Sequence, residues 1–430
     1  MTPYSELSKS QLSGILTDLQ KEYAQEQEKK LKLDLSRGKP DQAQLNLTMG
    51  YLDVLNSSDS PYAHDGSECR NYGILEGIPE ARELMAQILD LAPEEVFIGG
   101  NSSLNMMHDC LVIAYIHGFP QSEKPWGKLE TVKVLCPAPG YDRHFAVSAH
   151  FGFELVTVPM TSFGPDMDMV EELVKNDSSI KMMWNIPKYS NPTGITYSDE
   201  TVRRLANLSP AAADFRIFWD NAYAVHDLHP GEGDVLLNLM AELKKNGKED
   251  MAFLFTSTSK IAFPGGGIAA MGAAERNMAY MKKHFALQTI GYDKLNQLRH
   301  VRYFKDINGI KQHMTKHAAL LLPKFTLMLD TLQQQLGGLG IASWDVPRGG
   351  YFISLDAPDG CAKRIVQLCG EAGVAMTPAG ATYPYSTDSR DRNIRIAPTF
   401  ATLEELAEAA QLFCLCVRIA AAEKLLEQKQ

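Results

Sequence analysis

The sequence lacks the features that would direct it into a membrane, onto nucleic acid or into an oxidising compartment. No apolar run approaches the roughly 20 residues that a helix needs to span a bilayer, and residues 1–10 carry no apolar signal core. The formal net charge of -10 argues against a general binder of nucleic acid or anionic membranes. The seven cysteines form no paired framework, which is typical of a reducing compartment. We therefore expect a cytoplasmic protein without a structural metal site, since Cys414 and Cys416 point apart in a helical pattern.

What the sequence does contain is a regular alternation of buried strands and helices. The length of 430 residues exceeds one ordinary core, so two or three domains are expected. From Pro79 onward, short apolar runs alternate with helical patterns, as in a mostly parallel sheet covered on both faces. Ligands of such sheets bind beyond the carboxyl ends of the strands. The predicted strands are 96–98, 132–135, 155–158, 180–184, 217–219 and 251–255.

The last third of the chain predicts a second, smaller body. A long helical pattern from about 291 to 337 contains no proline except Pro323, and such a helix usually bridges two bodies. We expect an N-terminal segment (1–50) that joins the small domain, a large α/β domain (51–320) and a small α+β domain (321–430). In the small domain, strands are predicted at 342–344, 350–355 and 394–397, and helices at 361–372 and 403–427.

Lys260 stands directly after the predicted strand 251–255, in the stretch Ser-Thr-Ser-Lys at 257–260. A lysine just beyond a buried strand is partly desolvated, which favours its neutral amine. A neutral amine can attack a carbonyl and form a Schiff base. The neighbouring hydroxyls are suitable donors to a phosphate, and the glycines at 265–267 let the backbone approach a ligand. Taken alone, the stretch favours a lysine on a surface loop.

Two further polar groups follow predicted strands and precede helices. Gly-Gly-Asn-Ser-Ser at 99–103 opens a helix, whose free N–H groups suit a phosphate. An ordinary helix cap would have the same composition. The rigid turn Pro-Ala-Pro-Gly at 137–140 places Tyr141 at the next helix start, where its ring would stack on a planar ligand or pack on the core.

A turn and a carboxylate complete the set. Asn-Pro-Thr-Gly at 191–194 has good β-turn chemistry, yet it lies on the strand-end side of the sheet. Asp220 ends a buried strand, where a carboxylate is costly unless it is paired. Either a ligand cation, such as a protonated pyridine nitrogen, or a cap on a following helix would explain Asp220. Together, the lysine, phosphate cradle, stacking ring, amide, phenol and carboxylate are what pyridoxal phosphate requires.

The order of four motifs resembles that of the fold-type-I, class I/II aminotransferases, and most nearly their type Ic aspartate aminotransferase subgroup. The motifs are at 191–194, 220–223, 257–260 and 395–398, and the resemblance extends over 34–399. It implies a mostly parallel seven-stranded sheet in the large domain. It also implies ping-pong transfer of an amino group from an L-amino acid, expected to be L-aspartate, to a 2-oxo acid, expected to be 2-oxoglutarate.

The resemblance assigns a role to each cofactor residue. Lys260 would hold pyridoxal phosphate through a Schiff base and then shuttle the substrate's α-proton. Asp220 would keep the pyridine nitrogen protonated, and Asn191 and Tyr223 would hydrogen-bond the ring oxygen. Tyr141 would stack on the ring. The implied phosphate ligands are Gly100, Asn101, Ser102 and Ser257, with Ser259 a weaker candidate.

The resemblance also implies a substrate clamp and a homodimer with shared active sites. Arg395 would bind the substrate α-carboxylate, because its planar fork matches a carboxylate. Gly38 would let the N-terminal segment close over the substrate. Tyr72, in Arg-Asn-Tyr-Gly at 70–73, would reach the phosphate bound by the partner subunit.

One departure concerns the loop after the lysine, where the family usually has a phosphate-binding arginine. Residues 264–268 contain none, and our hypothesis is that Lys294 or Arg299 supplies the charge, either within the subunit or across the dimer. The residue for a distal substrate carboxylate is not assigned; Arg37 and Lys294 are candidates.

Aromatic, alanine or aminoadipate transamination and β-lyase chemistry are alternatives on the same fold. An aminotransferase-like regulator is disfavoured, since residues 1–33 are too few for its helix-turn-helix module.

Overall fold

A computed structural model describes residues 2–429. Its main sheet has eight strands in the order β2-β9-β8-β7-β6-β3-β4-β5. The five strands from β8 to β4 are mutually parallel, whereas β9 is antiparallel to both neighbours and β5 is antiparallel to β4. The strands are β2 (Val96–Ile98), β3 (Lys133–Ala138), β4 (Glu154–Thr161), β5 (Gly164–Pro165), β6 (Ile180–Asn185), β7 (Arg216–Asp220), β8 (Ala252–Ser257) and β9 (Ala269–Ala273).

All six strands predicted for this sheet are present with small changes at their ends. The sequence gives little sign of β9, because Ala-Ala-Met-Gly-Ala lacks the β-branched and aromatic residues that favour strands. β9 is the seventh strand of the expected seven-stranded sheet, and the two-residue β5 adds an eighth at the edge.

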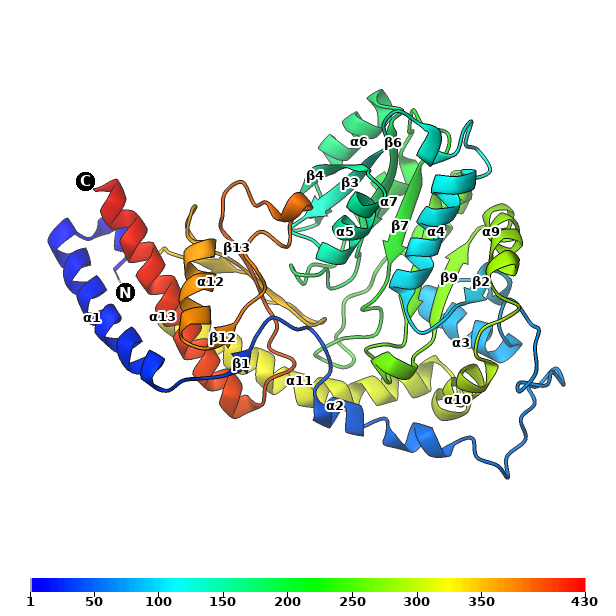
Figure 1. Cartoon of the computed structure of the whole chain (residues 1–430), viewed down its shortest axis with the longest axis horizontal. Helices are drawn as coiled ribbons and strands as arrows, with labels where there is room; N and C mark the ends of the chain where they lie inside the picture. The colour runs from blue at the N-terminus through cyan, green and yellow to red at the C-terminus, as the bar shows by residue number, and fades with distance from the viewer. Residues whose placement is uncertain (1, 430) are drawn as a thin grey trace.

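Helices cover both faces of the main sheet (Figure 1) because alternate side chains of its strands point to opposite sides. In β7, Ile217 and Trp219 belong to one hydrophobic cluster and Phe218 to another. Both layers are therefore dry, and the sheet is rigid along its length. The covering helices are α3 (Pro79–Leu89), α4 (Ser103–His117), α5 (Asp142–His150), α6 (Met167–Asn176), α7 (Asp199–Asn207), α8 (Leu239–Lys245) and α9 (Glu275–Gln288).

The long helical pattern is two helices, α10 (Lys294–Phe304) and α11 (Ile307–Leu336), so the expectation of one helix was wrong. The chain breaks at Lys305, whose φ is 67°, and restarts where Asp306 accepts a hydrogen bond from the Gly309 N–H at 2.9 Å. The bridging role predicted for this segment belongs to α11. It runs beneath both parts of the molecule (Figure 1) and packs on α2 (Gln42–Asn46) and α13 (Leu403–Gln428).

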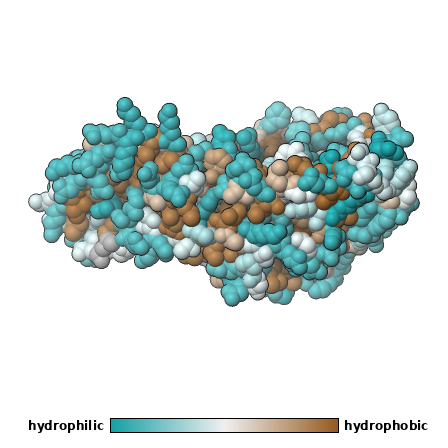
Figure 2. Space-filling view, turned by 90° about the horizontal axis from the view of Figure 1, so that it is seen from below, coloured by the Kyte–Doolittle hydropathy of each residue, from teal (hydrophilic) through white to brown (hydrophobic). Residues whose placement is uncertain are grey.

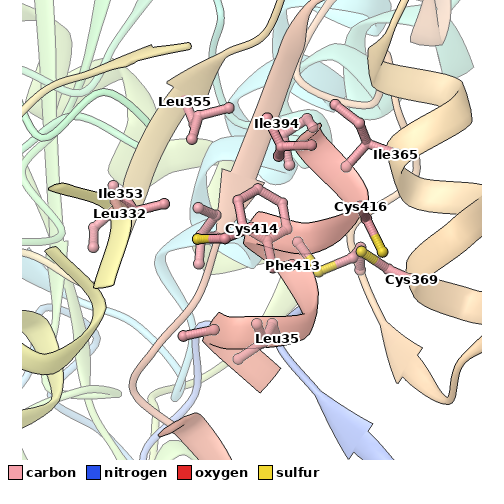
Figure 3. Packing of buried hydrophobic residues seen from close by; sticks show 14 of the residues in the cluster. Leu35, Leu332, Ile353, Leu355, Ile365, Cys369, Ile394, Phe413, Cys414 and Cys416 are labelled. Carbon is pink, nitrogen blue, oxygen red and sulfur yellow. The ribbon is translucent and has the colours of Figure 1, made fainter. Parts of the chain in front are cut away.

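The second body contains both ends of the chain. α1 (Lys9–Glu28), which begins with the capping box predicted at Ser8, packs along α13. In Figure 3, Leu35 lies in the same core as Ile353, Ile394 and Phe413. Further elements are the parallel pair β1 (Leu33–Asp34) and β12 (Val374–Ala375), the antiparallel sheet β10 (Ser343–Trp344), β11 (Ile353–Asp356) and β13 (Asn393–Ile396), and the helix α12 (Ala362–Glu371).

The face seen from below is mostly hydrophilic, with hydrophobic residues gathered in places (Figure 2). No helix in the described part of the chain combines the length and apolar composition that crossing a bilayer takes. The domain limits proposed from the sequence remain predictions.

Candidate active site

Lys260 lies in the turn that follows β8, beside the ends of the neighbouring parallel strands. Its Nζ is 5.0 Å from the ring centroid of Tyr223 and 5.9 Å from that of Tyr351. Burial lowers the pKa of Lys260, and the nearby Asp220 carboxylate opposes this effect without cancelling it. The amine therefore loses its proton more readily than an exposed lysine, as Schiff-base formation requires.

Asp220 ends β7 with both carboxylate oxygens buried. Its Oδ2 is 3.1 Å from Nε2 of His144, and the His144 ring stacks on Trp184 at 4.2 Å between centroids. Its Oδ1 has no hydrogen-bond partner among the described residues. The alternative of a helix cap was wrong, because in the described structure no helix follows Asp220 until α8 begins at Leu239. Since an unpaired buried oxygen is costly, this atom fits a cationic partner such as a protonated pyridine nitrogen.

The predicted phosphate cradle is assembled from the start of α4 and the lysine turn. Ser102 is the N-cap residue of α4, yet its side chain makes no capping hydrogen bond, so an ordinary Ser cap does not describe it. Ser259 Oγ donates to the Asn101 carbonyl at 3.1 Å, and Ser257 Oγ donates to Ser259 Oγ at 3.1 Å. The Gly100 carbonyl accepts a hydrogen bond from the backbone of β9. The start of α4 and the hydroxyls of the lysine turn therefore lie together, as an anion site at a helix start would need.

The glycine loop is closely packed at Gly267, whereas a Cβ on Gly265 would meet nothing within 4 Å. A Cβ on Gly267 would lie 3.1 Å from Thr258 Oγ1. Asn296 of α10 donates to the carbonyls of Gly266 and Gly267 at 3.0 Å each, which fixes this helix against the loop. Arg299 lies one turn further along α10, and its Nε is buried without a partner in the described structure.

Lys294, the other candidate for the missing charge, is already engaged. Its Nζ donates to the carbonyls of Asn71 at 2.7 Å and Gly73 at 2.9 Å. Lys294 therefore holds the segment that carries Tyr72. Tyr72 itself is 83% exposed, so within one subunit it takes no part in the site.

Arg395 of β13 reaches across to the large sheet. Its Nη1 is 3.0 Å from Asp142 Oδ1 and 3.3 Å from Asn191 Oδ1. Its guanidinium also lies 5.0 Å from the ring centroid of Phe352. A Cβ on Gly38 would lie 2.1 Å from that same ring. Gly38 therefore packs against one side of Phe352, and Phe352 in turn contacts Arg395. Arg37, by contrast, is exposed and pairs with Asp34 at 3.4 Å.

Two tyrosines border the space between Lys260 and Arg395. Tyr223 is buried, and burial raises its pKa well above the usual value, with further contributions from Tyr141 and Asp220. Burial likewise raises the pKa of Tyr141 to about 12. The Tyr141 ring meets the His144 ring edge-on at 5.0 Å and also packs on the core. Both phenols therefore stay protonated and able to donate hydrogen bonds.

Four residues of this region were not predicted from the sequence: His144, Asp142, Tyr351 and His226. The local sequence gives little sign of their roles. His144 and His226 each lie three residues beyond a predicted tyrosine. His226 is buried near Tyr223 and Tyr351, and burial lowers its pKa well below the usual value. Neither ring nitrogen of His226 has a partner within the part of the chain that is described.

Known proteins resemble the chain over nearly its whole length. A family model described as aspartate amino-transferase matches residues 7–429. A putative aminotransferase of Mycolicibacterium smegmatis is 46% identical over 95% of this chain and 96% of its own length. An aspartate aminotransferase of Corynebacterium glutamicum is 44% identical over 94% and 93%. The crystal structure of an aspartate transaminase from Corynebacterium glutamicum superposes with a TM-score of 0.95 at 42% identity, covering 98% of this chain and 99% of that one. A putative aminotransferase from Corynebacterium diphtheriae gives 0.92 at 45% identity, covering 95% and 100%.

Proposed function

The chain belongs to the aspartate aminotransferase family and is an aminotransferase, and we propose that it transfers the amino group of L-aspartate to 2-oxoglutarate. The family implies pyridoxal phosphate as cofactor. The observation that carries the choice of aspartate is the near full-length match to the Corynebacterium glutamicum enzyme of that name. Aromatic, alanine or aminoadipate donors and β-lyase chemistry are the alternatives that the experiment below separates.

The residues present fit the cofactor. Pyridoxal phosphate, when bound, supplies an electron sink for the bonds at the substrate α-carbon. The unpartnered Oδ1 of Asp220 would pair with the protonated ring nitrogen, and His144 would hold the other oxygen in place. Tyr141 would stack on the ring, and Asn191 and Tyr223 would bind the ring oxygen. The phosphate would lie at the start of α4 against Gly100, Asn101, Ser102, Ser257 and Ser259.

Lys260 and Arg395 would act on the substrate. Lys260, with its lowered pKa, would take the substrate's α-proton on Nζ. It would then give the proton up again to complete the transfer. Arg395 would bind the α-carboxylate and so fix the α-carbon beside that amine.

We also propose a cytoplasmic homodimer. The exposed apolar side chains Tyr72, Leu287 and Ile290, at 83%, 86% and 63%, support burial against a second copy. Lys294 would then present Tyr72 to the phosphate bound by the partner subunit.

Arg299, with its unpartnered Nε, is the better candidate for the charge that the glycine loop lacks. All seven cysteines are free and buried, which supports a reducing compartment.

The assignment of aspartate is tested by adding amino acids one at a time to the purified holoenzyme. L-Aspartate should convert the cofactor to its amine form, seen as loss of the long-wavelength absorbance band. Its kcat/KM with 2-oxoglutarate should exceed that of L-alanine by roughly 100-fold or more, because alanine leaves the site for the side-chain carboxylate unpaired. Aromatic donors and 2-aminoadipate complete the panel. Retention of the band with L-aspartate would remove the proposal.

Gly38→Ala should disturb the substrate clamp from outside it. The new Cβ would overlap the Phe352 ring, whose displacement should lower the free energy of unfolding by about 1–3 kcal/mol and raise the KM for L-aspartate. Chemical denaturation and steady-state kinetics measure both. Gly14→Ala is the control, since nothing lies within 4 Å of its Cβ in α1. A Gly38→Ala enzyme with wild-type KM and stability would contradict this prediction, because it would show that the Phe352 ring can move aside without measurable cost.

A further inference from the structure

Arg395 already holds a carboxylate that belongs to the chain itself. Asp142 Oδ1 lies 3.0 Å from its Nη1, the distance of a charge-assisted hydrogen bond. The Arg395 side chain is 9% exposed and that of Asp142 36% exposed. Because one partner is buried, water and salt screen this pair less than a surface ion pair.

The fold holds Asp142 in this position. Asp142 is the first residue of α5, where the helix dipole favours a carboxylate. Just before it, the Gly140 N–H donates to the Thr382 carbonyl at 2.7 Å, which ties the start of α5 to the segment preceding β13. Arg395 and Asp142 therefore meet because backbone contacts set their elements side by side.

We propose that Asp142 occupies the α-carboxylate subsite in the free enzyme and that an incoming substrate displaces it from Arg395. This inference rests on the proposed role of Arg395. One guanidinium charge balances one carboxylate, so a second carboxylate at the same fork would be repelled by the first. Asp142 is partly exposed and can turn into water, whereas Arg395 is enclosed.

The exchange makes Asp142 a residue that sets substrate affinity. Each amino acid or 2-oxo acid gains its own ion pair with Arg395 only by giving up the one with Asp142. The net gain in binding is therefore smaller than the new contact alone would provide. The free energy of breaking the Arg395–Asp142 pair is lost equally from the bound substrate and from the transition state. It therefore affects KM and leaves kcat unchanged.

The test is the affinity of the holoenzyme for succinate, a dicarboxylate with no amino group to transfer. Asp142→Asn should lower the Kd of succinate by about tenfold, in the range of coupling measured for close charge pairs. It should also lower the KM for L-aspartate and 2-oxoglutarate without changing kcat. In an Arg395→Gln background, which itself should weaken succinate binding, adding Asp142→Asn should change nothing, because the pair is already broken.

Asp199→Asn is the matched control, since Asp199 is the first residue of α7 and pairs with Arg203 at 3.1 Å. It removes the same charge from a helix start and should leave the Kd unchanged. Asp142→Ser replaces Asp142→Asn if the latter does not fold. An unchanged or raised Kd in a folded Asp142 variant overturns the inference alone, provided that Arg395→Gln weakens binding. Unaltered binding in Arg395→Gln overturns the proposed clamp and the inference together.

Discussion

Lys260→Ala should abolish the absorbance band of the lysine-bound cofactor and lower the transamination rate by about 10⁴-fold or more. The substitution removes the proposed covalent anchor, which is the only amine placed beside Tyr223 and Tyr351 within the described residues. The fold should persist, because the backbone of this turn is held by Thr258, whose N–H donates to the Ile268 carbonyl at 2.9 Å.

Absorbance spectra, steady-state rates and circular dichroism measure these three outcomes. Lys283→Ala, on the exposed side of α9, is the control and should leave the spectrum unchanged. If Lys260→Ala kept either the band or more than a tenth of the rate, another amine would have to be the anchor. Lys294 is then the next candidate, although its Nζ is held by two carbonyls.

Asp220→Asn should lower kcat/KM by about 10³-fold. It would remove the carboxylate of the proposed pair with the cofactor's ring nitrogen and leave the positive charge of that nitrogen uncompensated. Asparagine keeps an oxygen toward His144 and fills the same volume, so the loss would report charge rather than shape. His144→Gln, which retains a donor toward Asp220, should cost only about tenfold.

Asp214→Asn is the control for this substitution. Asp214 is also a buried carboxylate, paired with Lys181 at 2.7 Å, but it lies before β7 rather than at its end. Its replacement should lower stability in denaturation and leave the kinetics of the folded enzyme unchanged. Equal kinetic losses in both variants would mean that Asp220 supports the sheet and not the cofactor.

The main sheet was largely predictable because each of its central strands is a short buried apolar run. Ile217, Phe218 and Trp219 must all be buried whatever the partner strands, so composition alone identifies β7. The small residues of β9 pack between neighbours that the local sequence does not specify, and it was missed for that reason. The break between α10 and α11 was missed because the left-handed backbone at Lys305 breaks no local rule of helical composition.

The candidate site was predictable only as far as its residues follow strands. Lys260, Asp220 and Asn191 all lie at one end of the sheet because parallel strands deliver their carboxyl ends to the same edge. His144 and Asp142 could not be assigned, since their partners Asp220 and Arg395 are distant in sequence and meet them only through tertiary packing. Lys294 was a candidate for the missing charge, but its two carbonyl contacts were not foreseen.

The pairing of β1 with β12 has a consequence for synthesis on the ribosome. Leu33 pairs with Val374, and α1 packs on α13, so a segment translated early has to wait for partners that are translated much later. The strands from β2 to β9 have by then been translated and can form the main sheet as a unit. We therefore expect residues 9–34 to remain unpaired through most of translation and to dock when the C-terminal body brings Arg395 to the main sheet.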